Sequence, residues 1–421
     1  MTEIQHNWAG NIDYHAVHWH TPTTTEQVQD IVRNSHKIRG LGSRHSFNSI
    51  ADSDDTIISL KQMNRILEID ADAQTVTVEG GITYGELCKT LHERGFALRN
   101  LASLPHISIV GACMTATHGS GEANGNLATA VSAIELVTAN GNLIKRNRAE
   151  HADEFAGMVV NLGALGIVTQ VTLDIVPTFD MRQDVYLNLS FEDLYNNFDA
   201  IQASGYSVSL FTHWDNNHIT QAWVKSIVAD DASFTLGDSL FSAKRSIIQQ
   251  SPVGDDRTAR CTEQTGIAGA WYDRLPHFRM EFTPSHGDEL QSEYFVPRES
   301  AIEAIQAVHD LHRDITPLLH VTEIRTIKAD DLWLSTAYGR DSVALHFTWK
   351  PMWEEIRPVL GKLESVLMPF AVRPHWGKVF MMKADDVQTN YDRLTDFQDL
   401  MHRYDPDGKF QNRFLADYLR Q

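Results

Sequence analysis

The chain has 421 residues, more than one hydrophobic core usually organises, so two domains are expected. Its 55 acidic and 36 basic residues give a formal charge of −19, which disfavours nucleic acid and anionic membranes, because both bind clustered cations. Three widely spaced cysteines exclude a disulfide framework. The N-terminus shows no signal-peptide pattern, and no apolar run approaches the roughly 20 residues of a membrane helix. We therefore expect a cytoplasmic protein.

Short helices and strands alternate over the first 180 residues. Thr24 and Thr83 each stand three residues before Gln or Glu, a capping-box spacing that predicts a helix start. Alternating or continuous apolar runs predict strands at 57–60, 66–69, 75–78, 134–137 and 168–176. Pro177 is a plausible domain boundary.

Longer strand-like runs and more aromatic residues mark the middle of the chain, from about 180 to 370. Strand-like patterns occur at 280–282 and 343–349, and an amphipathic helix is predicted at 301–311. The last 45 residues return to helix and contain the turn 405–408. The whole pattern predicts an α+β protein of two domains.

Residues 40–48, Gly-Leu-Gly-Ser-Arg-His-Ser-Phe-Asn, form the most informative loop of the first domain. Small residues let a backbone approach a ligand closely, and successive N–H groups can bind a pyrophosphate. Taken alone, the loop favours a simpler interpretation, a tight turn in which His45 is an ordinary residue. Two further runs of small residues, at 104–121 and 161–168, favour a binding site for a long flat cofactor. A tightly packed buried loop would have the same composition.

Polar pairs follow two predicted strands of the second domain. Period-2 alternation places Glu323 and Arg325 on one face of one strand, and His346 and Thr348 on one face of another. Side by side, the two strands would build a polar floor in an apolar sheet. Lys378 follows Trp-Gly and precedes apolar residues, so it can point inward. The simpler alternatives are a solvated ion pair, a core histidine and a surface lysine.

These segments resemble the vanillyl-alcohol-oxidase type of FAD-linked oxidoreductases. The resemblance is nearest to the group that oxidises alditols such as xylitol, and it spans nearly the whole chain in order. It is carried by Asn-Trp-Ala-Gly-Asn at 7–11, the loop 42–48, the run 104–121, Glu-Leu-Gln-Ser-Glu-Tyr at 289–294, the strand and loop 322–335, and His-Trp-Gly-Lys at 375–378.

The resemblance implies an α+β, two-domain fold of the vanillyl-alcohol-oxidase type. Residues 1–178 would form an FAD-binding domain of two small α/β subdomains, to which 376–421 return. Residues 179–375 would form a substrate domain with a large, mostly antiparallel sheet flanked by helices.

The resemblance also implies FAD attached covalently through His45, by a bond to the 8α-methyl group of the flavin. Such a bond raises the flavin potential and prevents loss of the cofactor. The residues it places at the cofactor are Leu41, Gly42, Ser43, Arg44, His45, Ser46, Phe47, Ser108, Gly111, Ala112, Thr115, Ala116, His118, Gly119, Ser120, Gly121, Gly166, Ile167 and His375.

The activity implied is oxidation of the terminal hydroxyl of a polyol, such as xylitol or sorbitol, to the aldose, with O2 reduced to H2O2. Lys378 is the first candidate for the base, because burial and Arg325 would lower its pKa towards neutrality. The residues implied as catalytic are Lys378, Glu323, Arg325 and His346, and those implied for substrate binding are Ser108, Gln291, Glu323, Arg325, Thr348 and Lys378. The expected partners are therefore a small polyol and O2, and we expect a monomer.

Two other functions stay open. A sugar-1,4-lactone oxidase or dehydrogenase of the same superfamily shares the Glu-x-Arg strand and the His-Trp-Gly-Lys motif. Twenty histidines, including His15, His18 and His20, suggest a metal-binding protein, but this cluster lacks clear carboxylate or cysteine partners. No metal site is therefore assigned.

Overall fold

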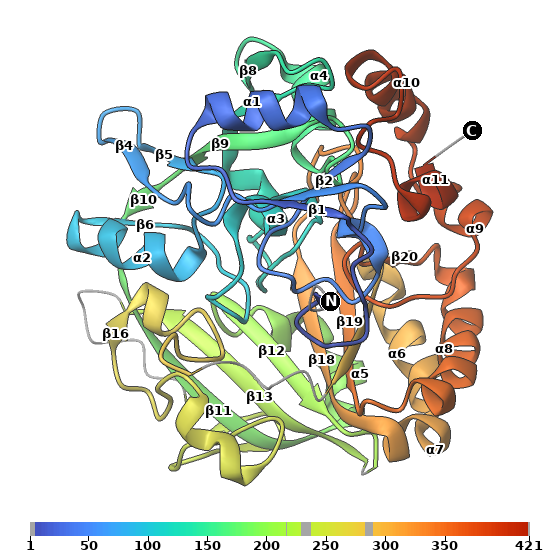
Figure 1. The fold of residues 1–421 in the computed structure, drawn as a ribbon. Coiled ribbons are helices and arrows are strands. Elements are labelled where there is room, and N and C mark those ends of the chain that lie inside the picture. Colours follow the sequence, from blue (N-terminus) through green and yellow to red (C-terminus); the bar gives the residue numbers. More distant parts are fainter. Residues whose placement is uncertain (1–4, 216, 229–236, 283–288, 420–421) are drawn as a thin grey trace.

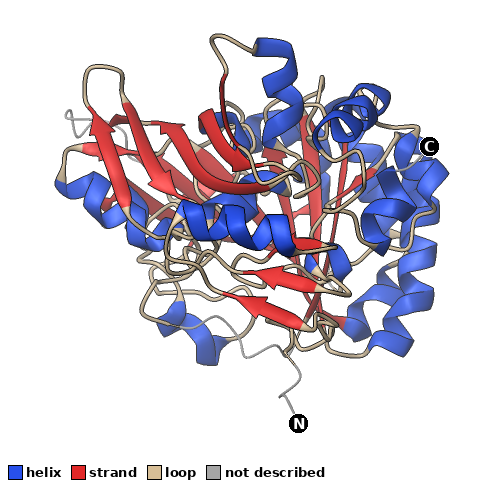
Figure 2. Ribbon diagram, turned by 45° about the horizontal axis from the view of Figure 1, so that its top comes forward, coloured by secondary structure: helices blue, strands red, loops and turns tan. Residues whose placement is uncertain are grey.

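The strands of the chain are arranged in four sheets in the computed structural model, which describes residues 5–419 except 216, 229–236 and 283–288 (Figure 1). Figure 2 shows strands filling the middle of the molecule and helices gathered along its right-hand side. No helix of the described part is long and apolar enough to cross a membrane.

Three small sheets form the first half of the chain. One is parallel, with the order β1-β3-β2; one is antiparallel, with the order β4-β5-β9-β7-β8; the third pairs β6 with β10. The elements are β1 (His18–His20), α1 (Thr25–Asn34), β2 (Ile38–Gly40), β3 (Thr56–Ile58), β4 (Ile66–Asp70), β5 (Thr75–Glu79), α2 (Tyr84–Glu93), β6 (Phe96–Ala97), α3 (Ile109–Met114), β7 (Val131–Val137), β8 (Leu143–Asn147), α4 (Ala152–Val159), β9 (Ile167–Asp174) and β10 (Val176–Pro177).

Local chemistry explains where the first two long helices begin. The hydroxyl of Thr24 accepts a hydrogen bond from the backbone N–H of Gln27 at the start of α1. At the start of α2, Thr83 and Glu86 form the complete reciprocal capping box. Both predicted starts are therefore confirmed.

The second half of the chain forms one ten-stranded sheet. The order of its main path is β14-β15-β11-β13-β12-β18-β19-β17-β20, and β16 pairs with β11. The elements are β11 (Asp180–Ser190), α5 (Phe191–Gln202), β12 (Ser207–Thr212), β13 (His218–Ile227), β14 (Ser239–Leu240), β15 (Ala243–Arg245), β16 (Gly269–Ala270), β17 (Leu290–Pro297), α6 (Ala301–His309), α7 (His312–Ile315), β18 (Leu319–Ile327), β19 (Ser342–Trp349), α8 (Trp353–Leu367) and β20 (Arg373–Pro374).

The two faces of this sheet differ in chemistry. Side chains such as Leu210, Ile324 and Leu345 belong to the main apolar core, together with residues of the helices α5, α6 and α8 that cover this face (Figure 1). Because side chains alternate along a strand, the neighbouring residues Glu323 and His346 point to the opposite face. That face turns towards the first half of the chain and carries the polar groups described below.

The last helices pack back on the first half of the chain. They are α9 (Ala384–Gln388), α10 (Leu394–Tyr404) and α11 (Arg413–Leu419). The Asn412 amide donates to the backbone oxygens of Ser49 and Ile50, and Arg39 donates to the Phe410 carbonyl at 2.7 Å. The large antiparallel sheet flanked by helices agrees with the predicted fold class, whereas the boundaries at 178 and 376 stay predictions.

One predicted strand is wrong. Residues 280–282 form a turn, in which the N–H of Phe282 faces the Arg279 carbonyl at 3.4 Å. Met280 and Phe282 are exposed, and the Met280 carbonyl contacts a ring nitrogen of His106 at 2.9 Å. Three residues of alternating polarity were too short a run to distinguish a strand from a loop that borders a cavity.

Candidate active site

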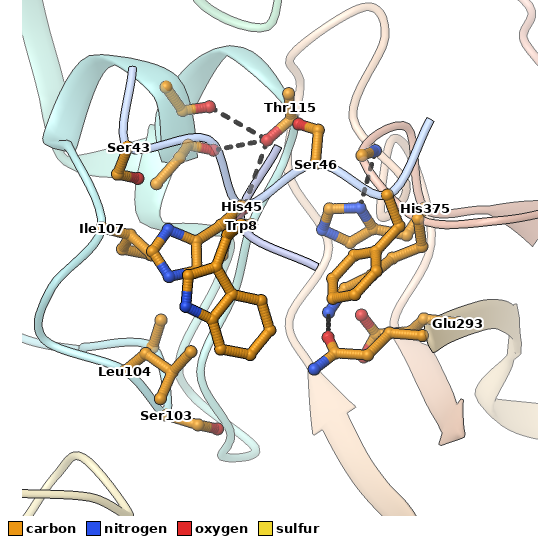
Figure 3. Close-up of a pocket in the computed structure, with 18 of the residues that line it drawn as sticks. Trp8, Ser43, His45, Ser46, Ser103, Leu104, Ile107, Thr115, Glu293 and His375 are labelled. Carbon is orange, nitrogen blue, oxygen red and sulfur yellow. Dashed lines mark hydrogen bonds between the residues drawn. The ribbon is translucent and has the colours of Figure 1, made fainter. Parts of the chain in front are cut away.

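One large cavity lies between the loops of the first half and the polar face of the large sheet (Figure 3). Its empty space, including the open mouth, is about 1870 Å³. Its walls come from the residues around 40–47, 102–118 and 375–378, and its floor from β12, β17, β18 and β19. Segments far apart in the sequence therefore meet around a single space.

The floor is a row of side chains that crosses four neighbouring strands. Phe211 on β12 pairs with Glu323 on β18, which pairs with His346 on β19. His346 in turn pairs with Glu293 on β17. Two residues further along the same strands, Thr348 on β19 pairs with Gln291 on β17. The two predicted polar strands are thus adjacent and in register, which confirms the predicted polar floor.

A buried network of charges holds Arg325 at the centre of this floor. Its Nη2 donates to Glu293 Oε1 at 2.6 Å, and its Nε lies 3.6 Å from Glu323 Oε1. The ring of His118 contacts the same Glu293 oxygen at 3.0 Å. Burial alone would raise the pKa of both carboxyl groups, but Arg325 and the neighbouring histidines hold each pKa well below its ordinary value. Both groups are therefore ionised at neutral pH.

Lys378 extends from the wall to the part of the floor formed by Gln291 and His346. Its ammonium group contacts the Gln291 carbonyl oxygen and lies 3.3 Å from His346 Nε2. Burial lowers the pKa of Lys378 to about 8, with Arg325 adding to the shift and Glu293 opposing it. Burial, with the charge of Lys378, lowers the pKa of His346 to about 3. At pH 7 the lysine can exchange a proton, whereas the histidine stays neutral.

His45 faces this cavity from the glycine loop. Its ring stacks on Trp8, with ring centroids 5.2 Å apart and planes 24° apart (Figure 3). Burial lowers the pKa of His45 to about 4, partly opposed by the Ser43 backbone. Neither ring nitrogen has a hydrogen-bond partner of normal geometry among the described residues. A neutral buried imidazole with both nitrogens unused is unusual unless a further group completes it.

Other unused polar atoms in the wall and floor of the same cavity fit a bound cofactor. Ser108 Oγ and Arg325 Nε are buried without a hydrogen-bond partner within the described part of the chain. The backbone approaches Ser108 closely, because a Cβ at Gly42 or Gly111 would lie 2.4 or 2.7 Å from its Oγ. Free donors beside glycines that cannot carry side chains are what a long, flat cofactor requires. The residues present therefore fit FAD.

Most of the predicted site residues line the cavity. For the cofactor these are Leu41, Gly42, Ser43, Arg44, His45, Ser46, Phe47, Ser108, Gly111, Ala112, Thr115, His118 and His375. For the substrate they are Ser108 again, Gln291, Glu323, Arg325, Thr348 and Lys378, together with the predicted catalytic residue His346.

Six predicted cofactor residues do not line it: Ala116, Gly119, Ser120, Gly121, Gly166 and Ile167. Ser120 donates to the Val208 carbonyl, and the N–H of Gly121 donates to Thr326 O at 3.0 Å, so both anchor a loop to the large sheet. Gly119 packs on Asn100 and Leu101, Gly166 packs on Leu136 and Val137, and Ala116 and Ile167 belong to the apolar core. Their small or apolar side chains pack closely on the protein here, and their contact with the cofactor stays a prediction.

Several lining residues carried no individual prediction. Glu293, Trp8 and His277 line the cavity, and so do Leu162 and Gly163 of the third small-residue run. Period-2 alternation from Gln291 would have indicated Glu293. His277 has no such signal, because it lies in a loop without periodicity. Only the tertiary structure brings it to the cavity.

Comparison with known proteins identifies the family. Residues 18–147 match the FAD binding domain family, and residues 286–420 match the D-arabinono-1,4-lactone oxidase family. Alditol oxidase from a Streptomyces species is 44% identical over 100% of both chains. This chain belongs to the alditol oxidase family. It is an FAD-binding oxidoreductase of the kind that the motifs predicted.

Lactone-acting members of the superfamily are more distant. L-gulono-1,4-lactone dehydrogenase from Mycobacterium tuberculosis is 29% identical over 100% of this chain and 99% of its own length. L-gulonolactone oxidase from Mus musculus is 27% identical over 97% and 96%. The alditol group is therefore the nearer of the two predicted groups.

Solved structures show the same fold. Cholesterol oxidase from B. sterolicum matches with a TM-score of 0.80 and 16% identity, covering 99% of this chain and 96% of its own. Glucooligosaccharide oxidase from Acremonium strictum, a protein described with a 6-S-cysteinyl, 8α-N1-histidyl FAD, matches with a TM-score of 0.74 and 14% identity over 99% and 94%. At such identities the likeness concerns the fold alone.

The histidines that suggested a metal site have other contacts. A ring nitrogen of His15 lies 2.7 Å from Asp52, and one of His18 lies 3.9 Å from Asp55. Within the described ranges, no group of three or more His, Cys, Asp or Glu side chains could hold a metal ion.

Proposed function

We propose that the chain oxidises the terminal hydroxyl of an acyclic polyol, such as xylitol or sorbitol, to the aldose, with FAD bonded covalently to His45. The balanced reaction is R–CH2OH + O2 → R–CHO + H2O2. The observation that carries the proposal is that the polar floor of Glu323, Arg325 and His346, with Lys378 beside it, shares one cavity with the His45 ring. The nitrogens of that ring have no hydrogen-bond partner of normal geometry among the described residues.

The walls of the first half would hold the cofactor. When bound there, FAD would supply the hydride acceptor and the redox chemistry that links the alcohol to dioxygen. The low pKa of His45 keeps its imidazole neutral, so a ring nitrogen has a free electron pair for a bond to carbon. Trp8 holds the ring in one plane. Gly42 packs directly against Ser108, whose hydroxyl offers a donor to the cofactor.

Lys378 is the proposed base. A base serves best when its pKa lies near the working pH, and the pKa of Lys378, about 8, meets this condition. His346 and Glu323 are too weakly basic, since both pKa values lie far below neutrality. Lys378 would take the hydroxyl proton at Nζ, while the carbonyl oxygen of Gln291 orients the amine.

The remaining floor residues would bind substrate hydroxyl groups. An ionised Glu323 accepts hydrogen bonds from hydroxyls, and Arg325 donates to them. We assign these two residues to the hydroxyls nearest the reacting carbon, and Thr348, Gln291 and His346 to those further along. A substrate that lacks a hydroxyl would leave a buried partner unpaired, so the site should discriminate against deoxy analogues.

Two measurements test the proposal. The purified protein is precipitated with acid, and yellow colour is expected to stay with the pellet. Peroxide release is then compared for xylitol, sorbitol, D-arabinono-1,4-lactone and L-gulono-1,4-lactone at equal concentration. The proposal requires a higher kcat/KM for a polyol than for either lactone, and a colourless pellet would refute the covalent bond.

A lactone oxidase or dehydrogenase is the second candidate function. The match of residues 286–420 to the D-arabinono-1,4-lactone oxidase family favours it. A higher kcat/KM for a lactone, with oxygen or with an artificial electron acceptor, would establish it in place of the polyol activity.

A further inference from the structure

Beside the polar floor, on the same face of the sheet, lie a lysine and a histidine that the proposed chemistry does not use. Lys225 lies on β13, and His277 lies in the loop before β17. The register of β13, β12 and β18 places Lys225 on the same face of the sheet as Glu323. Lys225 is 1% exposed, whereas His277 reaches the wall of the cavity.

The hydrogen bonds of this pair select one tautomer of His277. Lys225 Nζ donates to the Leu275 carbonyl at 2.5 Å and lies 3.3 Å from the Pro276 carbonyl and 3.0 Å from His277 Nδ1. Nε2 lies 2.7 Å from Oε1 of the ionised Glu323, which can only accept, so the neutral ring carries its proton on Nε2. Nδ1 is then the acceptor that faces Lys225 Nζ.

The result is a carboxylate held at one of its two oxygens. His277 and Arg325 both approach Glu323 through Oε1. Within the described ranges, Oε2 has no hydrogen-bond partner, and Glu323 lines the cavity. We propose that His277, oriented by Lys225, is a positioning residue that fixes Oε1 of Glu323 and so turns Oε2 towards a substrate hydroxyl. This inference rests on the proposed function, because it assumes that Glu323 binds the polyol.

The surroundings of His277 suit such a role. Its ring meets the edges of Phe211 and Trp223, with centroid distances of 5.5 and 5.1 Å. Its backbone N–H donates to the Ser103 carbonyl at 3.0 Å, and its carbonyl accepts from Thr262 at 2.9 Å. The imidazole therefore has little freedom to turn. Its fixed orientation determines where its Nε2 binds Oε1 of Glu323.

Stability alone does not explain Lys225. A buried ammonium group is costly, and such groups usually have a carboxylate partner. The hydrogen bonds of Lys225 go to two backbone carbonyls and to His277. Burial lowers the pKa of Lys225 to about 7 and, with the charge of Lys225, that of His277 to about 4, which agrees with the neutral ring required above. Perturbed groups of this kind concentrate at functional sites.

Three variants test the inference with xylitol as the probe. His277→Phe keeps the ring and removes both hydrogen bonds; His277→Gln keeps a side chain that can donate and accept. Lys225→Met keeps the stem and removes Nζ, so His277 Nδ1 loses the donor that orients the ring. We expect a rise in KM of about tenfold or more for His277→Phe and Lys225→Met, with a smaller change in kcat, because binding is weakened in both ground and transition states. His277→Gln should stay within about threefold of the wild type.

His309→Phe is the matched control. His309 stacks on Phe191 on the other face of the large sheet and does not line the cavity, so its replacement should leave KM unchanged. Equal losses in His277→Gln and His277→Phe would show that packing matters and would overturn the inference. An unchanged KM in Lys225→Met would overturn it as well, even if His277→Phe failed to fold. A wild-type enzyme inactive on xylitol and sorbitol would instead refute the proposed function.

Discussion

Replacing Lys378 with methionine removes the proposed base and keeps most of the length of its side chain. Burial lowers the pKa of this lysine from 10.5 to about 8, so about a tenth of the molecules carry a free amine at pH 7. The free fraction falls about tenfold for each pH unit below the pKa. In the wild type, kcat/KM should therefore rise about tenfold from pH 6 to pH 7 and level off above about pH 8.

In Lys378→Met this rise should disappear, and kcat should fall about 10²- to 10⁴-fold, the usual contribution of a general base. Peroxide release from xylitol, measured between pH 5.5 and 9.5, gives both quantities. Lys362→Met is the control, because Lys362 lies on the exposed side of α8 and pairs with Asp314 at 2.8 Å. A variant that kept the same pH dependence would show that another group accepts the proton.

Three further predictions concern the cofactor and its surroundings. In His45→Ala, acid-precipitated protein should lose its yellow colour; colour retained in the pellet would place the covalent bond elsewhere. Trp8→Ala removes the stacking partner of His45 and should lower the covalently bound fraction of flavin, measured by fluorescence on a denaturing gel, whereas Trp8→Phe should keep it. Glu293→Gln removes a carboxylate that raises the pKa of Lys378, so the rise in kcat/KM should move to lower pH; a move to higher pH would contradict this electrostatic account.

Local patterns predicted the parts of the site that lie within one segment. Alternation along the strand showed that Glu323 and Arg325 share a face, because side chains in a strand follow a period of two whatever the fold. The helix start at Thr83 was equally predictable, since its capping box involves residues only three positions apart. These predictions needed no knowledge of the tertiary structure.

Composition does not distinguish the small residues that line the cavity from those that pack on other parts of the protein. Gly42 and Gly111 lie beside Ser108 in the cavity wall, whereas Gly121 and Gly166 pack against the large sheet and β7. A glycine is needed wherever two backbones approach closely, and the sequence does not state whether the second partner is a ligand or another strand.

Contacts between distant segments could not be predicted from local patterns at all. His277 lies 46 positions from Glu323 and 52 positions from Lys225, and no periodicity links the three. The strand order β13-β12-β18 puts Lys225 and Glu323 two strands apart on one face of the sheet, and His277 bridges them from a loop.

That strand order also explains why one face of the sheet can be both polar and stable. A shift of the register between β18 and β19 by a single residue would move His346 from the cavity to the helix-covered face and bring Leu345 or Phe347 into its place. Burying an imidazole among the apolar side chains of α5, α6 and α8 would be costly, and so would exposing two large apolar side chains to the cavity. The apolar face therefore fixes the register, and the register in turn aligns Glu323, His346 and Glu293 across three strands.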